Sequence, residues 1–213
     1  GGLNHLATDN PATQDILLKI AKWWMKETDV DGFRLDTYVH VAPSFWTRFF
    51  KEVRDYAGRM GKKNFLLLGE IYHGDPGAIV LELGRGRLGA AFNYPAYFKD
   101  IDALHGDAPA RMLEDAFQFI KDAFGGAARS LVRFMDNQDK PRFLRAKDPV
   151  GKLRVALAYT LLSVGIPFVF YGTEQAFRLV DRAVAMGLDG YREDMFADGK
   201  LKSESSEGAK FDA

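Results

Sequence analysis

The chain has 213 residues, enough for a large domain with a substantial core. Lys plus Arg and Asp plus Glu number 29 each, and this zero net charge argues against nucleic acid or an anionic membrane as the main partner. The chain has no cysteine, which excludes disulfides and thiolate metal sites and leaves the compartment and the oligomeric state open. No apolar run reaches the roughly 18 residues of a transmembrane helix.

The first third of the chain alternates helical and extended patterns. Asn10 and Pro11 suit the start of a helix, and apolar residues then recur at helical spacing to about Thr28. A short strand is expected over residues 30–36. A second helix is expected from about Pro43 to Met60. The apolar run in residues 64–69 predicts a strand buried on both faces.

The same alternation continues further along the chain. Residues 78–83 are ambiguous, and a short strand over 89–93 is expected to stop at Pro95. Helices are then predicted at 108–124 and 153–164, and strands at 130–135 and 166–171. We expect residues 1–186 to form one catalytic unit and residues 187–213 to form a polar tail or loop.

Alternating strands and helices predict a parallel sheet covered by helices. Asp36, Glu70 and Asp139 each follow a predicted strand. In a (β/α) barrel such residues converge at one mouth, whereas an open doubly wound sheet spreads them along an edge.

Converging carboxylates suit either an oxygen-ligand metal site or glycoside hydrolysis by a carboxylate pair. Arg34 and Asp36 leave the same face of one strand, so the arginine is expected to keep Asp36 ionised, as a nucleophile must be. Glu70 follows an apolar run and has no basic neighbour in sequence, so burial is expected to let it hold a proton.

Four ordered motifs resemble those of the α-amylase family of glycoside hydrolases. They are GFRLDTYVH at 32–40, LLLGE at 66–70, FMDNQD at 134–139 and YGTEQ at 171–175. They resemble, in turn, the nucleophile, acid/base, third-carboxylate and eighth-strand motifs. The resemblance implies a (β/α)8 TIM barrel, of which this chain would hold only strands 4–8, so it is expected to be a piece of a longer enzyme.

The resemblance also implies a role for each carboxylate. Asp36 would be the nucleophile and Glu70 the general acid/base, while Asp139 would hold sugar hydroxyls. Arg34 would hold Asp36 in place. His40 lies where the family often supplies a carbonyl to a structural calcium, and no organic cofactor is implied.

Residues near the three carboxylates are candidates for binding substrate. Tyr72 and His73 follow Glu70, and Arg142 follows Asp139. Gln138 departs from the resemblance, because the family usually has histidine there. Glutamine can bond a sugar hydroxyl but cannot carry a positive charge, so weaker transition-state stabilisation is expected. Arg34 completes this group of candidates.

The expected activity is retaining hydrolysis of α-1,4-glucosidic bonds in starch-like glucans or maltooligosaccharides. Transglycosylases and isomerases of the family use the same carboxylates. They remain alternatives, because the loops, and not the carboxylates, set the choice of acceptor. A relative that binds carbohydrate without turnover is the alternative from another class.

Overall fold

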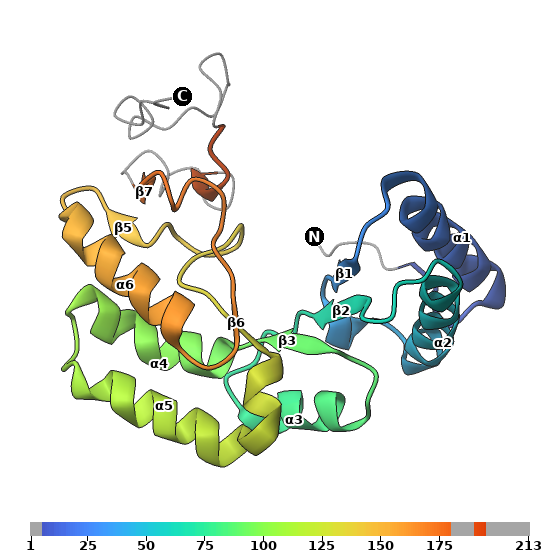
Figure 1. The fold of residues 1–213 in the computed structure, drawn as a ribbon, viewed down its shortest axis with the longest axis horizontal. Coiled ribbons are helices and arrows are strands. Elements are labelled where there is room, and N and C mark those ends of the chain that lie inside the picture. The colour runs from blue at the N-terminus through green and yellow to red at the C-terminus, as the bar shows by residue number, and fades with distance from the viewer. Residues whose placement is uncertain (1–5, 180–189, 195–213) are drawn as a thin grey trace. The chain divides into compact units, whose positions relative to one another are not determined.

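The computed structural model describes residues 6–179 and 190–194. It divides into two compact units, of residues 1–94 and 95–213. The ribbon in Figure 1 runs from blue in the first unit to orange and red in the second.

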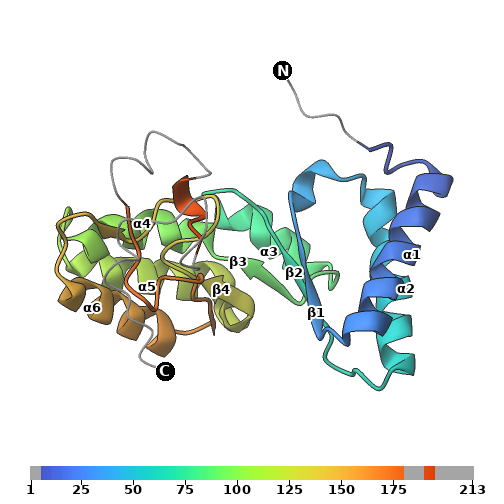
Figure 2. The same cartoon turned by 90° about the horizontal axis from the view of Figure 1, so that it is seen from above.

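The first unit alternates helices with parallel strands. Strand β1 pairs with β2 and β2 pairs with β3, both in parallel (Figure 2). Its elements in chain order are α1 (Pro11–Thr28), β1 (Gly32–Leu35), η1 (Tyr38–His40), α2 (Pro43–Arg59), β2 (Leu66–Gly69), α3 (Pro76–Gly84) and β3 (Ala90–Phe92).

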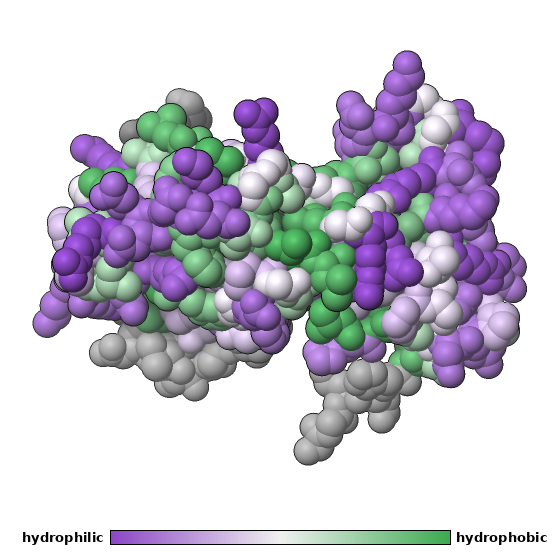
Figure 3. All heavy atoms as spheres, turned by 90° about the horizontal axis from the view of Figure 1, so that it is seen from below, coloured by the Kyte–Doolittle hydropathy of each residue, from purple (hydrophilic) through white to green (hydrophobic). Residues whose placement is uncertain are grey.

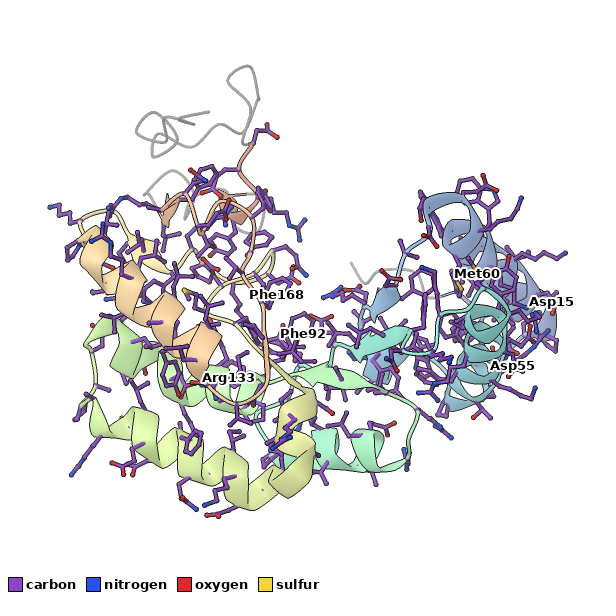
Figure 4. All side chains as sticks on the ribbon, in the orientation of Figure 1. Asp15, Asp55, Met60, Phe92, Arg133 and Phe168 are labelled. Carbon is purple, nitrogen blue, oxygen red and sulfur yellow. The ribbon has the colours of Figure 1, made fainter. Side chains whose placement is uncertain are left out.

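The sequence fixes the start of α1 through a side-chain cap. The Asn10 Oδ1 atom accepts a hydrogen bond from the Ala12 amide at 2.9 Å, and Pro11 occupies the first turn. Helices α1 and α2 pack side by side, and Figure 4 shows Asp15 and Asp55 on their outer surfaces. The predicted helices that begin at Pro11 and Pro43 are confirmed.

Strands β1 and β2 approach each other closely at their first residues. Gly32 pairs with Leu66, and a Cβ atom on Gly32 would lie 2.6 Å from the Leu66 carbonyl oxygen. Glycine is therefore required there. Phe33 turns toward α2, where its ring lies 6.5 Å from that of Phe49. These contacts anchor the strand that carries Arg34.

The second unit is also α/β. Strand β4 pairs with β6 in parallel, and β5 pairs with β7 in parallel. Its elements are α4 (Tyr94–His105, which begins at the last residue of the first unit), α5 (Arg111–Phe124), η2 (Gly125–Ser130), β4 (Leu131–Arg133), β5 (Leu144–Arg145), α6 (Val150–Leu162), β6 (Ile166–Pro167) and β7 (Arg178–Leu179).

One buried cluster holds the second unit together. The cluster contains buried side chains from β5, from α6 and from the segments beside β4 and β5, with two residues of α4 packed against them. The buried residues are Met135, Phe143, Leu144, Leu153 and Ala156, and those of α4 are Ile101 and Leu104. Arg133, labelled in Figure 4, points from β4 to Asp100 on α4, with 2.5 Å between Nη2 and Oδ2. These contacts fix the segment that leads to Asp139.

Several details of the second unit differ from expectation. Pro95 does not simply stop a strand, because it sits in the first turn of α4, where its missing amide costs nothing. Strands β5 and β7 were not predicted, and β6 covers only the start of the expected strand at 166–171. The ambiguous residues 78–83 belong to helix α3.

The proposed boundary at residues 186 and 187 lies outside the described residues. Within the expected tail, however, Glu193 is buried against Arg142 of the second unit. None of the described helices is long and apolar enough to cross a membrane. On the face drawn in Figure 3, hydrophilic residues surround areas of hydrophobic surface.

Candidate active site

The parallel register of β1 and β2 brings Asp36 and Glu70 together. Leu35 pairs with Gly69 at the carboxyl ends of the two strands, and Asp36 and Glu70 are the residues that follow. The Glu70 amide donates to the Leu35 carbonyl at 3.0 Å, which extends the pairing by one residue. Both carboxylates therefore emerge from the same end of the sheet.

Arg34 joins the two carboxylates. Its Nη1 atom donates to Asp36 Oδ1, and its Nη2 atom lies 2.9 Å from Glu70 Oε1. The Asp36 side chain is 66% exposed and that of Glu70 is 9% exposed. The width of one guanidinium fork thus limits the separation of the two groups, well below the roughly 10 Å beyond which a carboxylate pair cannot act on one bond.

Glu70 has no basic neighbour in sequence, but the fold gives it a cationic neighbour in space. Sequence adjacency shows only residues of the same strand, whereas Arg34 reaches Glu70 from the paired strand. The expected pairing of Arg34 with Asp36 is confirmed. The buried Glu70 side chain therefore has a cationic partner.

Two further donors reach Glu70. The Thr37 amide donates to Oε2 at 3.0 Å, and the Tyr94 hydroxyl donates to Oε1 at 3.3 Å. Thr37 has φ 43° and ψ 42°, a left-handed conformation that is rare for a β-branched residue. This conformation aims the amide at the carboxylate.

Two buried aromatic residues stabilise the turn after β1 through hydrogen bonds. The Tyr38 hydroxyl donates to Glu82 Oε2 at 2.7 Å, and the Trp46 indole donates to the Tyr38 carbonyl at 2.9 Å. Burial, reinforced by Glu82, raises the pKa of Tyr38 well above its usual range, so the phenol stays protonated as a donor. This anchor holds Thr37 in place.

Exposed side chains flank the pair. Tyr72 is 57% exposed, and its ring meets that of buried Tyr94 edge-on, with 4.8 Å between centroids. His73 is exposed, and its Nδ1 atom accepts from the Asp75 amide at 3.0 Å. Phe92, labelled in Figure 4, lies with its ring centroid 6.0 Å from the Arg34 guanidinium carbon.

In the second unit, Asp139 is half-buried, and each of its carboxylate oxygens accepts one hydrogen bond. Gln138 Nε2 donates to Asp139 Oδ2 at 2.9 Å, and the Asp139 amide donates to Asn137 Oδ1 at 2.8 Å. Arg192 Nη2 lies 3.0 Å from Asp139 Oδ1. The predicted neighbours Gln138 and Asp139 are in direct contact, whereas nothing in the sequence pattern pointed to Arg192.

Arg142 lies inside the second unit, with a side chain that is 0% exposed. It pairs with Glu193 at 2.8 Å, donates to the Tyr171 carbonyl at 2.6 Å and stacks on Phe170 with 4.5 Å between its Cζ atom and the ring centroid. This burial argues against the expected direct contact with a sugar. The contacts instead support a role in fixing the turn after β6.

Asp136 is the other buried charge near this turn. Its carboxylate accepts from the Phe143 amide at 3.0 Å and from the Thr173 hydroxyl at 2.8 Å. Burial nevertheless raises the pKa of Asp136 to about 6. These bonds connect the segment that bears Asp139 to the turn after β6.

Among the described residues, His40 does not belong to a group of side chains that could bind a metal ion. It is exposed at the end of η1, and no group of three or more His, Asp or Glu side chains among the described residues could hold a metal ion. Calcium takes six to eight oxygen ligands, of which a His40 carbonyl would supply one. The described residues therefore do not fit a calcium site, and the role of His40 stays a prediction.

A cavity of about 300 Å³ lies in the second unit between α5, η2 and Arg133. None of the predicted site residues lines it. The chemistry-bearing side chains are instead gathered at the ends of β1 and β2 and in the segment after β4.

Known proteins resemble this chain along most of its length. The family model for the α-amylase catalytic domain matches residues 2–210. The chain is 37% identical to a β/α-amylase of Paenibacillus polymyxa, over 83% of this chain and 14% of that protein. It is 31% identical to an α-amylase of Streptomyces lividans, over 83% of this chain and 20% of that protein.

Solved structures agree with these matches. The crystal structure of the α-amylase from Geobacillus thermoleovorans complexed with acarbose superposes with a TM-score of 0.70 at 37% identity, over 83% of this chain and 41% of that chain. The chain thus spans well under half the length of these relatives. It belongs to the α-amylase family, and its parallel α/β units are part of that family's (β/α)8 barrel.

Proposed function

We propose that the protein hydrolyses α-1,4-glucosidic bonds in starch-like glucans or maltooligosaccharides with retention of anomeric configuration. The observation that carries this proposal is the Arg34 bridge, which holds Asp36 and Glu70 on one guanidinium at the ends of paired strands. Retaining enzymes need their two carboxyl groups about 5–5.5 Å apart, and a shared guanidinium favours such closeness. The names of the relatives, which include amylases and a cyclomaltodextrinase, support an α-glucan as the substrate.

Asp36 is the proposed nucleophile. Its carboxylate is exposed, and Arg34 occupies Oδ1. The other oxygen, Oδ2, is then the one that attacks the anomeric carbon as the bond to the leaving oxygen breaks. The product of this step is a glycosyl ester on Asp36.

Glu70 is the proposed general acid and base. It protonates the leaving oxygen in the first step, and in the second step it takes a proton from the water that cleaves the ester. Its burial and the Tyr94 hydroxyl group on Oε1 support this role, because a partly dry site shields the proton transfer from bulk water.

Further residues are proposed to hold the sugar. Asp139, with one oxygen bonded to Gln138 and the other to Arg192, is proposed to bind sugar hydroxyls and stabilise the oxocarbenium-like transition state. Gln138, Tyr72 and His73 are proposed to add hydrogen bonds and stacking to the substrate. Calcium enters no step of this mechanism.

Release of reducing sugar from starch tests the proposal, with Asp36→Asn as the control. Wild-type release that the variant loses would support hydrolysis, and equally low release by both would favour a carbohydrate-binding role instead. Chromatography of maltotriose digests separates hydrolysis from transglycosylation, because only the latter produces chains longer than the substrate.

A further inference from the structure

The polar partners of Glu70 are distributed unevenly between its two oxygens. Oε1 forms an ion pair with Arg34, whose Nη2 atom lies 2.9 Å away, and accepts a hydrogen bond from the Tyr94 hydroxyl at 3.3 Å. Oε2 receives only the Thr37 amide, at 3.0 Å, among the described residues. A carboxylate offers about two lone-pair positions on each oxygen. Oε1 is therefore engaged by a cation and a hydroxyl group, whereas Oε2 keeps one open position.

We propose that Tyr94 is a positioning residue for Glu70. Its hydroxyl group and the Arg34 cation both engage Oε1, so that Oε2 carries the transferred proton. This inference rests on the proposed function. In the first step the Oε2 proton moves to the glycosidic oxygen, which keeps the electron pair of the breaking bond. In the second step Oε2 accepts a proton from water, while Tyr94 keeps its own.

The surroundings of Tyr94 suit this role. The residue is 1% exposed at the start of α4, directly after strand β3, so its hydroxyl has little freedom to turn away. Tyr72 covers its ring edge-on. The groups that face the Glu70 carboxylate are Arg34 and Asp36 from the β1 segment, the Thr37 amide, and Tyr94. Tyr94 is the neutral side-chain donor in this set.

Tyr94→Phe removes the hydroxyl and keeps the ring. A hydrogen bond to the charged form of a carboxyl group favours that form, so its loss makes the proton harder to remove. Carbon-13 NMR of the full protein labelled at glutamate side chains would follow the Glu70 titration, with the resonance assigned by its absence in Glu70→Gln. We expect the midpoint to rise by about 0.5–1 pH unit in Tyr94→Phe.

Tyr56→Phe is the matched control. Tyr56 lies on α2 under the Arg59 guanidinium, with 5.5 Å between the Cζ atom and the ring centroid, and loses the same oxygen atom. In the Tyr56→Phe variant, the midpoint of the Glu70 titration should equal that of the wild type. Coincident midpoints in the wild type and Tyr94→Phe would overturn the proposal, even if Tyr94→Phe lowered the melting temperature, because the hydroxyl would then be only structural.

The same variants separate this inference from the proposed function. In an active enzyme, the basic limb of kcat/KM against pH should move upward with the NMR midpoint in Tyr94→Phe. If the Glu70 midpoint rises in Tyr94→Phe but the wild-type protein releases no sugar, the proposed function is refuted and the Tyr94–Glu70 relationship stands. Hydrolysis with an unmoved midpoint would sink only the role of Tyr94.

Discussion

The Nη2 atom of Arg34 lies 2.9 Å from the Oε1 atom of Glu70, although Arg34 lies on β1 and Glu70 follows the paired strand β2. The same guanidinium also donates to Asp36. The Arg34 guanidinium thus orients two carboxylates that have different proposed roles. The planar guanidinium of arginine can contact both at fixed positions, whereas the ammonium group of lysine is a single charge on a flexible chain.

Arg34→Lys should therefore lower kcat/KM about 100-fold, because an ammonium group cannot hold both carboxylates in one geometry. The measurement is steady-state kinetics on maltotriose. Arg48→Lys is the matched control, since Arg48 also pairs with two carboxylates, those of Asp15 and Glu52, but on the outer surface of the helices. Equal losses in the two variants would contradict a special role for Arg34.

Glu70→Gln should lose about 10²–10⁴-fold in hydrolysis of maltotriose, because the leaving sugar is then not protonated. The loss of the bond-cleavage step should be much smaller with α-maltosyl fluoride, whose leaving group needs little help from an acid. Pre-steady-state release of fluoride measures that step. Asp36→Asn is expected to fail on both substrates, and an Asp36→Asn variant that cleaves the fluoride at the rate of Glu70→Gln would refute the assigned roles.

Gln138→His should raise kcat/KM severalfold on maltotriose. Gln138 donates to Asp139 Oδ2 at 2.9 Å, and a protonated histidine in its place would make a stronger, charge-assisted bond. The gain should shrink as pH rises through the range in which histidine loses its charge. A pH-independent effect, or a gain also seen in Gln138→Ala, would count against this reason.

Thr37→Asn should stabilise the protein by up to about 1 kcal/mol. Thr37 has φ 43°, and asparagine tolerates this left-handed conformation better than a β-branched residue. The backbone amide that reaches Glu70 is kept, so kcat should change little. Urea unfolding measures the stability, and a destabilised variant would show that the threonine side chain contributes more than its strain costs.

The buried Asp136 predicts a pH dependence of stability. Burial raises the pKa of Asp136 to about 6, above the value near 3.9 of an unfolded chain. Between about pH 4 and pH 6 the folded state therefore binds more protons than the unfolded state, so this group's contribution to stability falls as pH rises through that window and is constant above it.

Asp136→Asn should remove this contribution. The difference in free energy of unfolding, variant minus wild type, should be more positive at pH 7 than at pH 4 by on the order of 1 kcal/mol. Urea unfolding at both pH values gives the difference. Asp122→Asn, at an exposed position on α5, should show none. A constant Asp136→Asn difference across this range would mean that Asp136 titrates alike in both states.

Local signals predicted four of the helices and the strands that precede the proposed catalytic residues. Asn10 and Pro11 fix the start of α1, and the apolar run at 65–68 becomes strand β2, which is buried except at Leu66. The short strand expected before Pro95 is confirmed as β3, whereas helix α4 was missed, because a proline that follows a strand also suits the first turn of a helix. Strands β5 and β7 have two residues each, too few to produce a pattern.

The candidate site was less visible in the sequence where it depends on pairing between strands. Arg34 lies on β1 and Asp36 directly follows that strand, so their contact could be predicted from their spacing. The contacts of Glu70 with Arg34, Thr37 and Tyr94 require the register of the fold. The same is true of Arg192, whose contact with Asp139 spans a long stretch of chain.

Proton NMR of the first product released from maltotriose tests the central claim most directly. A nucleophilic Asp36 beside an acid/base Glu70 requires two displacements, so the new reducing end should appear first as the α-anomer and mutarotate afterwards. A β-anomer as the first product would mean a single displacement by water and would contradict the account.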